Sequence, residues 1–216
     1  AILAIYGTLD SKMSKSYNAI RAAWDITHET AKLREEMIER RKEIEKTRQL
    51  TESEENVFQA VLIDVGVGVD GGTVFYGNIG SHEHMANTVI GDNVNSASRL
   101  EGLTRFYHLP VIVSEYVKNE VTSESARYKF YEIDTVLVKG KTEGKKIYLP
   151  FDTNEMSTDL MNQYDIFEEG LQAYYKGDWK NARKSMKACE LEVAEVFLER
   201  MGTKGSAPAD WSGIWT

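Results

Sequence analysis

The sequence predicts an α+β fold, in which a sheet built mainly from hairpins is followed by a small helical unit. Between residues 61 and 149, short segments of alternating apolar residues are separated by turns that contain glycine, which is typical of strands. From about residue 159 the apolar residues recur at helical spacing. Strands that precede a run of helices favour an α+β class. We therefore expect one domain over residues 1–151 and a helical hairpin with a tail over residues 157–216.

Composition excludes several classes of protein. The 216 residues include 26 Lys and Arg against 34 Asp and Glu, for a net charge of −8, and no segment concentrates basic residues, so a nucleic-acid partner is not expected. The longest apolar run, residues 61–69, is interrupted by Asp64 and is far shorter than the roughly 18 residues of a membrane span. The single cysteine, Cys189, cannot form an intrachain disulfide, which favours the cytoplasm.

The N-terminal quarter is expected to contain a strand and a long helix. Residues 1–6 form an apolar run that ends at Gly7, which predicts a short buried strand. Because the chain starts on this run, without a methionine or a charged leader, we expect a fragment that begins inside a strand. A helix is expected from about Tyr17. Its charged continuation to about residue 49 is interpreted as a solvated extension held by Glu–Lys and Glu–Arg pairs, with a partner-binding arm as the alternative.

A hairpin and a helix are expected next. Residues 61–69 alternate in the period of a strand with one apolar face. The DGG sequence at residues 70–72 predicts a turn into a second strand over residues 73–76. After a polar loop, Asp92 is expected to cap a helix that runs to about Arg105.

The remaining elements are short. Residues 111–113 predict a strand, Ser114 a capped helix, and residues 128–138 and 146–149 a final hairpin.

The C-terminal segment predicts two helices joined at Gly177 and Asp178. The sequence GLQAYYKGDWKNA is similar to a single tetratricopeptide-type helical hairpin. One such hairpin cannot bury its own apolar face, so we expect it to dock onto the preceding domain. The tail, with Trp211 and Trp215, is expected to dock as an aromatic anchor.

The most informative segment is NTVIGDNVNSASRLEG at residues 87–102. Asn95 and Arg99 are four residues apart on the predicted helix, so their side chains are neighbours on one face. An amide beside a guanidinium near the positive end of a helix suits an anionic, hydroxyl-bearing ligand such as a nucleotide. The spacing alone is weak evidence, and by itself it favours a surface helix on which the two residues are incidental.

Several segments together resemble the class III nucleotidyl cyclases, the adenylate and guanylate cyclases. They are VGVGVDGGTVFYGNIGS, TVIGDNVNSASRLEGLT, VIVSE and VLVKGKTEGKKIYLPF, in the order and spacing of that family over about residues 1–151. The resemblance implies a ferredoxin-like catalytic domain that lacks its first strands. The helical hairpin and its DWSGIW tail are similar to the C-terminal extension of many bacterial cyclases.

The resemblance implies a role for four residues. Asn95 matches the asparagine that orients the ribose, and Arg99 matches the arginine that stabilises charge on the α-phosphate. Lys139 matches the lysine that contacts the terminal phosphates. Thr88 matches the position that reads the purine, where threonine favours adenine without excluding guanine, because a hydroxyl both donates and accepts.

The resemblance also implies Mg²⁺ or Mn²⁺, but no metal ligand is expected within this chain. The two metal-binding aspartates of the family would precede Ala1. Asp64 and Asp70 share a strand face but would stand about 20 Å apart, too far to hold one ion together. His82 and His84 are interpreted as solvated loop residues. The 216 residues alone are therefore expected to be inactive.

These observations predict an adenylate cyclase that converts ATP to cyclic AMP and pyrophosphate. The family builds each site across a dimer interface, which implies a homodimer, and an upstream membrane or sensor domain is compatible with it. The alternatives are a nucleotide-binding pseudo-cyclase that regulates a partner, a guanylate cyclase, and an interaction module built on the helical hairpin and the charged helix.

Overall fold

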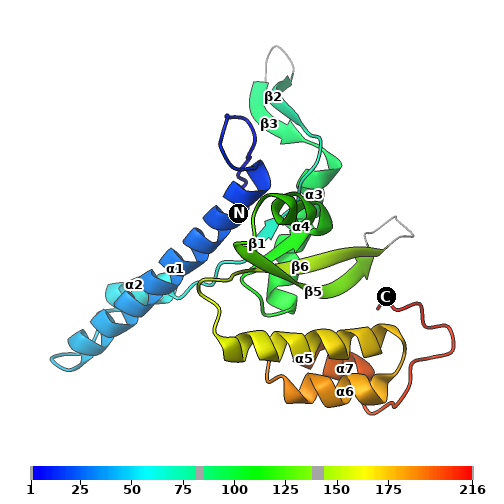
Figure 1. Ribbon diagram of the computed structural model, residues 1–216. Coiled ribbons are helices and arrows are strands. Elements are labelled where there is room, and N and C mark those ends of the chain that lie inside the picture. Colours follow the sequence, from blue (N-terminus) through cyan, green and yellow to red (C-terminus); the bar gives the residue numbers. More distant parts are fainter. Residues whose placement is uncertain (1, 81–84, 138–143, 216) are drawn as a thin grey trace.

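The computed structural model describes residues 2–80, 85–137 and 144–215. Within these ranges the elements follow in the order α1 (Lys15–Glu45), α2 (Glu52–Val61), β1 (Val67–Val69), β2 (Phe75–Gly80), β3 (Met85–Ile90), α3 (Asp92–Phe106), β4 (Val111–Ser114), α4 (Glu115–Glu124), β5 (Tyr128–Leu137), β6 (Gly144–Asp152), α5 (Thr158–Tyr175), α6 (Trp179–Ala188) and α7 (Glu192–Met201). Figure 1 shows a central sheet, an arm formed by β2 and β3, a long helix beside the sheet and a layer of C-terminal helices beneath it. The predicted α+β class is confirmed.

The central sheet has four strands in the order β1-β4-β6-β5. β1 runs parallel to β4, whereas β4 and β5 are both antiparallel to β6. The predicted last hairpin, β5 with β6, is therefore confirmed, and a register shift between Glu132 and Asp134 gives β5 an irregularity.

The core consists of two clusters, one on each face of the sheet, and the side chains of alternate β4 residues point into one or the other. Val111 and Val113 face α1 and α4, where Ile20 is fully buried. Ile112 points to the opposite face and joins a larger cluster that includes Phe167 of α5. Helices thus cover both faces of the sheet, as the strand period of two requires for a fully buried central strand.

The predicted N-terminal strand is not formed. Residues 2–6 have no regular structure, and the side chain of Ile2 is 99% exposed. A strand needs a hydrogen-bonded neighbour, and no strand of the described part of the chain lies beside this segment. The predicted helix does form as α1, with Ser14 as its N-cap, and Trp24 Nε1 fastens it to the sheet by donating to the Pro150 carbonyl at 2.9 Å.

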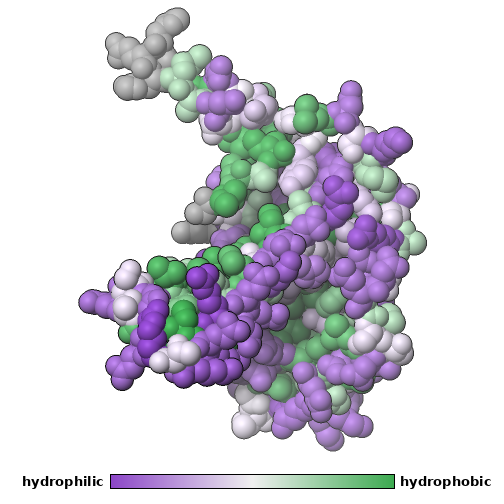
Figure 2. Space-filling model, turned by 90° about the vertical axis from the view of Figure 1, so that its left-hand side faces the viewer, coloured by the Kyte–Doolittle hydropathy of each residue, from purple (hydrophilic) through white to green (hydrophobic). Residues whose placement is uncertain are grey.

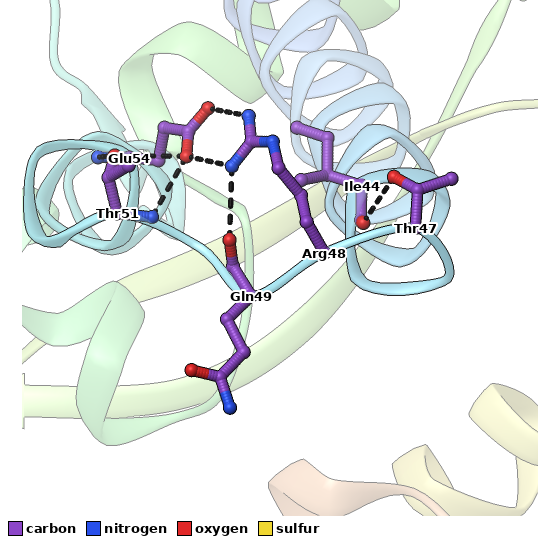
Figure 3. Close-up of polar contacts among 6 residues, drawn as sticks. All are labelled: Ile44, Thr47, Arg48, Gln49, Thr51 and Glu54. Carbon is purple, nitrogen blue, oxygen red and sulfur yellow. Dashed lines mark hydrogen bonds and ion pairs between the residues drawn. The ribbon is translucent and has the colours of Figure 1, made fainter.

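The charged part of α1 extends beyond the sheet and turns back into α2, a helix that the sequence analysis missed (Figure 1). Figure 3 shows the turn: the Arg48 guanidinium donates to both carboxylate oxygens of Glu54, at 2.6 and 2.8 Å. Thr51 and Glu54 form a reciprocal capping box that starts α2. Within α1 itself, Arg41 pairs with Glu45 and Lys42 with Glu39, the spacings of four and three residues that the interpretation as a solvated extension predicts.

The predicted strand at residues 61–69 is wrong for most of its length, and so is the hairpin that it was expected to form. Val61 ends α2, and only Val67–Val69 form a strand, which pairs with β4. β2 pairs instead with β3, as a separate arm in Figure 1. The DGG segment does not turn the chain back onto β1, and it is tightly packed: a Cβ on Gly72 would lie 2.0 Å from Asn93 Nδ2.

The C-terminal segment forms three helices, where two were expected. The second predicted helix is interrupted at Glu190, whose positive φ of 49° is incompatible with a helix, so that α6 and α7 are separate. The expected docking onto the sheet is confirmed, because Phe167 and Phe197 share one core cluster with Tyr131 of β5. The division into two domains remains a prediction, since this core crosses the expected boundary.

The tail docks mainly through one tryptophan. Trp211 Nε1 donates to the carbonyls of Tyr174 and Tyr175, both at 3.2 Å, and its ring packs edge-on against Trp179. Trp215 remains 43% exposed. Within the described ranges no helix is long and apolar enough to cross a bilayer.

Candidate nucleotide site

Helix α3 is placed by close contact with β1. A Cβ on Gly68 would lie 2.2 Å from the Glu101 backbone nitrogen, and one on Gly66 would lie 1.9 Å from Thr104 Oγ1. Only glycine permits this approach of helix to strand. The sequence analysis missed this role, although glycine at alternate positions of one strand face was a visible signal of close packing.

Asn95 and Arg99 lie on the outer side of α3. Both side chains are exposed, whereas Leu100 and Thr104 of the same helix are buried. The helix confirms that the two residues are one turn apart, as their spacing predicted. Within the described ranges no hydrogen bond or ion pair engages either side chain.

Thr88 lies on β3, three residues before the N-cap of α3 at Gly91. It is half-buried and faces Gly77 across the β2–β3 ladder. Side chains of directly opposed residues lie on the same face, and Gly77 has none, so the Thr88 hydroxyl is not covered from that side. Thr88, Asn95 and Arg99 thus come from two consecutive elements, β3 and α3.

Lys139 lies outside the described residues, as do His82 and His84. The strand residues that flank the Lys139 segment, Leu137 and Gly144, are paired in register.

Asp64 and Asp70, the two aspartates considered from the sequence, each have a partner other than a metal ion. Asp64 pairs with Arg34 of α1, and Asp70 Oδ1 accepts from the Gly71 backbone at 2.9 Å. In residues 2–80, 85–137 and 144–215, no three His, Cys, Asp or Glu side chains form a group that could hold a metal.

Asn95 and Arg99 lie on the surface of the chain, whereas Thr88 is half-buried. One surface hollow, of about 450 Å³, lies along β2 and β3, and another, of about 410 Å³, lies near the C-terminal end of α3. Neither is lined by Thr88, Asn95 or Arg99.

The arm of β2 and β3, which includes Thr88, carries exposed apolar side chains. Phe75 is 76% exposed and Met85 63%, and Tyr76 and Ile90 are also more than half exposed. Figure 2 shows the face that lies on the left in Figure 1. Apolar residues gather on the upper part of this face, where the arm and the N-terminal segment lie. An apolar surface of this kind is typical of a contact with another protein.

Residues 9–151 match the family model described as the adenylate and guanylate cyclase catalytic domain. The chain belongs to the class III adenylate and guanylate cyclase family. The matched segment contains β1 to β5, nearly all of β6, α3 and all four residues singled out from the sequence, and it ends before the C-terminal helices begin at Thr158.

Two curated relatives of this chain are named as adenylate cyclases. An adenylate cyclase of Anabaena cylindrica is 42% identical over 87 residues, which are 40% of this chain and 17% of the relative. The terminal-differentiation specific adenylate cyclase of Dictyostelium discoideum is 24% identical over 191 residues, which are 88% of this chain. The chain spans only 8% of the length of that second relative.

A bacterial light-regulated adenylyl cyclase of known structure is 28% identical to this cyclase. It superposes with a TM-score of 0.48 and covers 63% of this chain and 33% of its own.

Proposed function

We propose that this protein is an adenylate cyclase. The ribose 3′ oxygen of ATP attacks the α-phosphorus, the bond to pyrophosphate breaks, and the proton of the 3′ hydroxyl leaves to a base or to water. The observation that supports this best is the pair Asn95 and Arg99, exposed one turn apart on α3 in a chain of the cyclase family. The site of such an enzyme lies in the cytoplasm, where ATP is available.

In this proposal the residues act by positioning and by charge. Asn95 orients the ribose so that its 3′ oxygen faces the α-phosphorus. Arg99 stabilises the negative charge that develops on the α-phosphate as the new bond forms. Lys139 contacts the terminal phosphates, whose charge increases as pyrophosphate departs.

Thr88 is proposed to read the adenine, and its removal should relax the choice of base. A neutral hydrogen bond contributes about 0.5–1.5 kcal/mol net, so Thr88→Ala should lower the ATP-to-GTP ratio of kcat/KM by about 2- to 13-fold. Thr88→Ser, which keeps the hydroxyl, is the control. The measurement is steady-state formation of both cyclic nucleotides by the intact protein, by which we mean the form that carries the metal ligands. Preference of the wild type for GTP would contradict the assignment.

Mg²⁺ or Mn²⁺ is proposed as the cofactor on family grounds, with ligands other than the described carboxylates. Asp64 and Asp70 each have another partner. We therefore also propose that the 216 residues alone do not turn over ATP.

A homodimer is proposed because Asn95 and Arg99 are exposed in the single chain and the neighbouring arm has exposed apolar side chains. Phe75→Ser should weaken self-association about tenfold or more, since large exposed side chains at the centre of an interface contribute most to its affinity. The matched control is Leu33→Ser on α1, which removes an apolar side chain 47% exposed at a different surface. Sedimentation velocity over a concentration series measures both variants. Equal dissociation constants for Phe75→Ser and wild type would place the interface elsewhere.

A further inference from the structure

An arginine from the C-terminal helices reaches the end of α3. Arg200 of α7 donates through Nη1 to Asp134 Oδ2 at 2.6 Å and through Nη2 to the Tyr107 hydroxyl oxygen at 3.0 Å. The Tyr107 hydroxyl in turn donates to Asp134 Oδ2 at 2.6 Å. We call these three residues the Arg200 network. They join α7, Asp134 of the edge strand β5, and Tyr107, which is the C-cap of α3.

The Arg200 network is buried. The side chains of Asp134 and Arg200 are 1% and 9% exposed, and Tyr107 is fully buried. Burial, reinforced by the Asp134 carboxylate, raises the pKa of the Tyr107 phenol well above its usual value, so the hydroxyl is a neutral donor. A buried carboxylate requires such partners, and Arg200 is the cation that neutralises it.

Aromatic rings enclose the Arg200 guanidinium. Its central carbon lies 5.0 Å from the ring centroid of Phe197, 5.5 Å from Phe106 and 5.8 Å from Trp215. Phe106 is the last residue of α3. The C-terminal helices and tail therefore hold both the last residue of α3 and its cap through one side chain.

Helix α3 packs along its back against β1 and β4, and its C-terminal end is held by the Arg200 network. Its back lies against β1 at Gly68, and its outer side is open at Asn95 and Arg99. Arg99 precedes Tyr107 by eight residues, or about 12 Å of helix, so a shift of the C-terminal end is carried along the rigid helix to Arg99. Arg200 lies outside residues 9–151, the segment that the cyclase family model matches.

We infer that Arg200 is a positioning residue. Through Asp134 and Tyr107, the C-terminal helices fix the end of α3 and thereby the placement of Asn95 and Arg99. The part of this inference that concerns catalysis rests on the proposed function, whereas the part that concerns the order of α3 does not.

The test uses a variant that removes the Arg200 network without leaving a buried charge. Arg200→Met alone leaves the buried Asp134 carboxylate without its cation, and we expect it to lower the midpoint of the unfolding transition. The double variant Arg200→Met with Asp134→Asn is neutral, and we expect it to recover most of that midpoint. The control is Arg105→Met, which removes an 82% exposed arginine from the same end of α3.

Two measurements on the intact protein separate positioning from a merely structural role. In the double variant, hydrogen exchange of the amides of residues 95–106 should accelerate about tenfold, and kcat should fall about tenfold with KM for ATP within a factor of two. Arg105→Met should leave both values unchanged.

Each outcome decides the inference. Wild-type exchange and kcat in a double variant of recovered stability would overturn it, and so would a kcat that simply follows the unfolding midpoint across the series. Faster exchange with an unchanged kcat would overturn the catalytic part. If the wild type forms no cyclic AMP, the proposed function fails, and the exchange measurement alone decides whether Arg200 holds α3.

Discussion

Arg99→Ala is expected to lower kcat of the intact protein by about 10²–10³-fold with little change in KM for ATP. The guanidinium acts on charge that is greater in the transition state than in bound ATP, so its removal raises the barrier more than it weakens substrate binding. The side chain is exposed and engages no partner among the described residues, so the variant should fold with wild-type stability. Initial rates of cyclic AMP formation over a range of ATP concentrations measure both constants.

A matched control lies on the same helix. Arg105 lies six residues beyond Arg99, is 82% exposed and pairs with Glu101 at 3.0 Å. Arg105→Ala should leave kcat within a factor of two. Arg99→Lys keeps the charge but loses the planar fork, and we expect an intermediate kcat. An effect of Arg99→Ala on KM alone would show that the residue only binds the ground state.

Trp179→Ala is expected to lower the free energy of unfolding by about 3–5 kcal/mol. The side chain is 1% exposed, stacks on Tyr174 with 5.9 Å between ring centroids, and meets Trp211 of the tail edge-on at 5.4 Å. The alanine would leave a cavity at the junction of α5, α6 and the tail. Since this cluster continues into β5 and β6, we expect the whole core to lose stability together. Equilibrium denaturation in urea, followed by far-ultraviolet circular dichroism, measures the change.

The same substitution at a half-exposed tryptophan provides the comparison. Trp215 is 43% exposed, and Trp215→Ala should cost about 1 kcal/mol or less. Equal losses for Trp179→Ala and Trp215→Ala would contradict the placement of Trp179 in the core. A separate transition for the C-terminal helices in Trp179→Ala would show that the shared core does not make the two parts one cooperative unit.

The helices of this cyclase were predicted best where local signals agree. α3 ends within one residue of its predicted end, although its N-cap is Gly91 and not the predicted Asp92. The β5–β6 hairpin was predicted from the apolar residues on both sides of the segment KGKTEGK. Asn95 and Arg99 could be placed on one face of α3 for the same reason, because a helix relates residues four apart without reference to the rest of the chain.

The errors concern which strands pair with each other, because alternating apolar residues predict a strand but not its partner strand. Val67–Val69 was expected to pair with the next strand, but it pairs in parallel with β4, and β2 pairs with β3 in the arm. The capping box of Thr51 and Glu54 was present in the sequence and marks the start of α2, yet the valines beyond it were read as a strand. The apolar run at residues 2–6 has strand composition but no neighbouring strand in the described part of the chain.

The sequence by itself determined the family of this chain, the helix that carries Asn95 and Arg99, and the order of most elements, because motifs and helical periods are properties of neighbouring residues. Only the tertiary structure decided which strands pair, that Gly66 and Gly68 admit α3 against β1, and that Arg200 neutralises Asp134 from 66 residues away. These choices depend on which groups are buried together. A buried carboxylate or an unpaired strand edge requires a partner, but its own sequence does not specify which distant residue provides it.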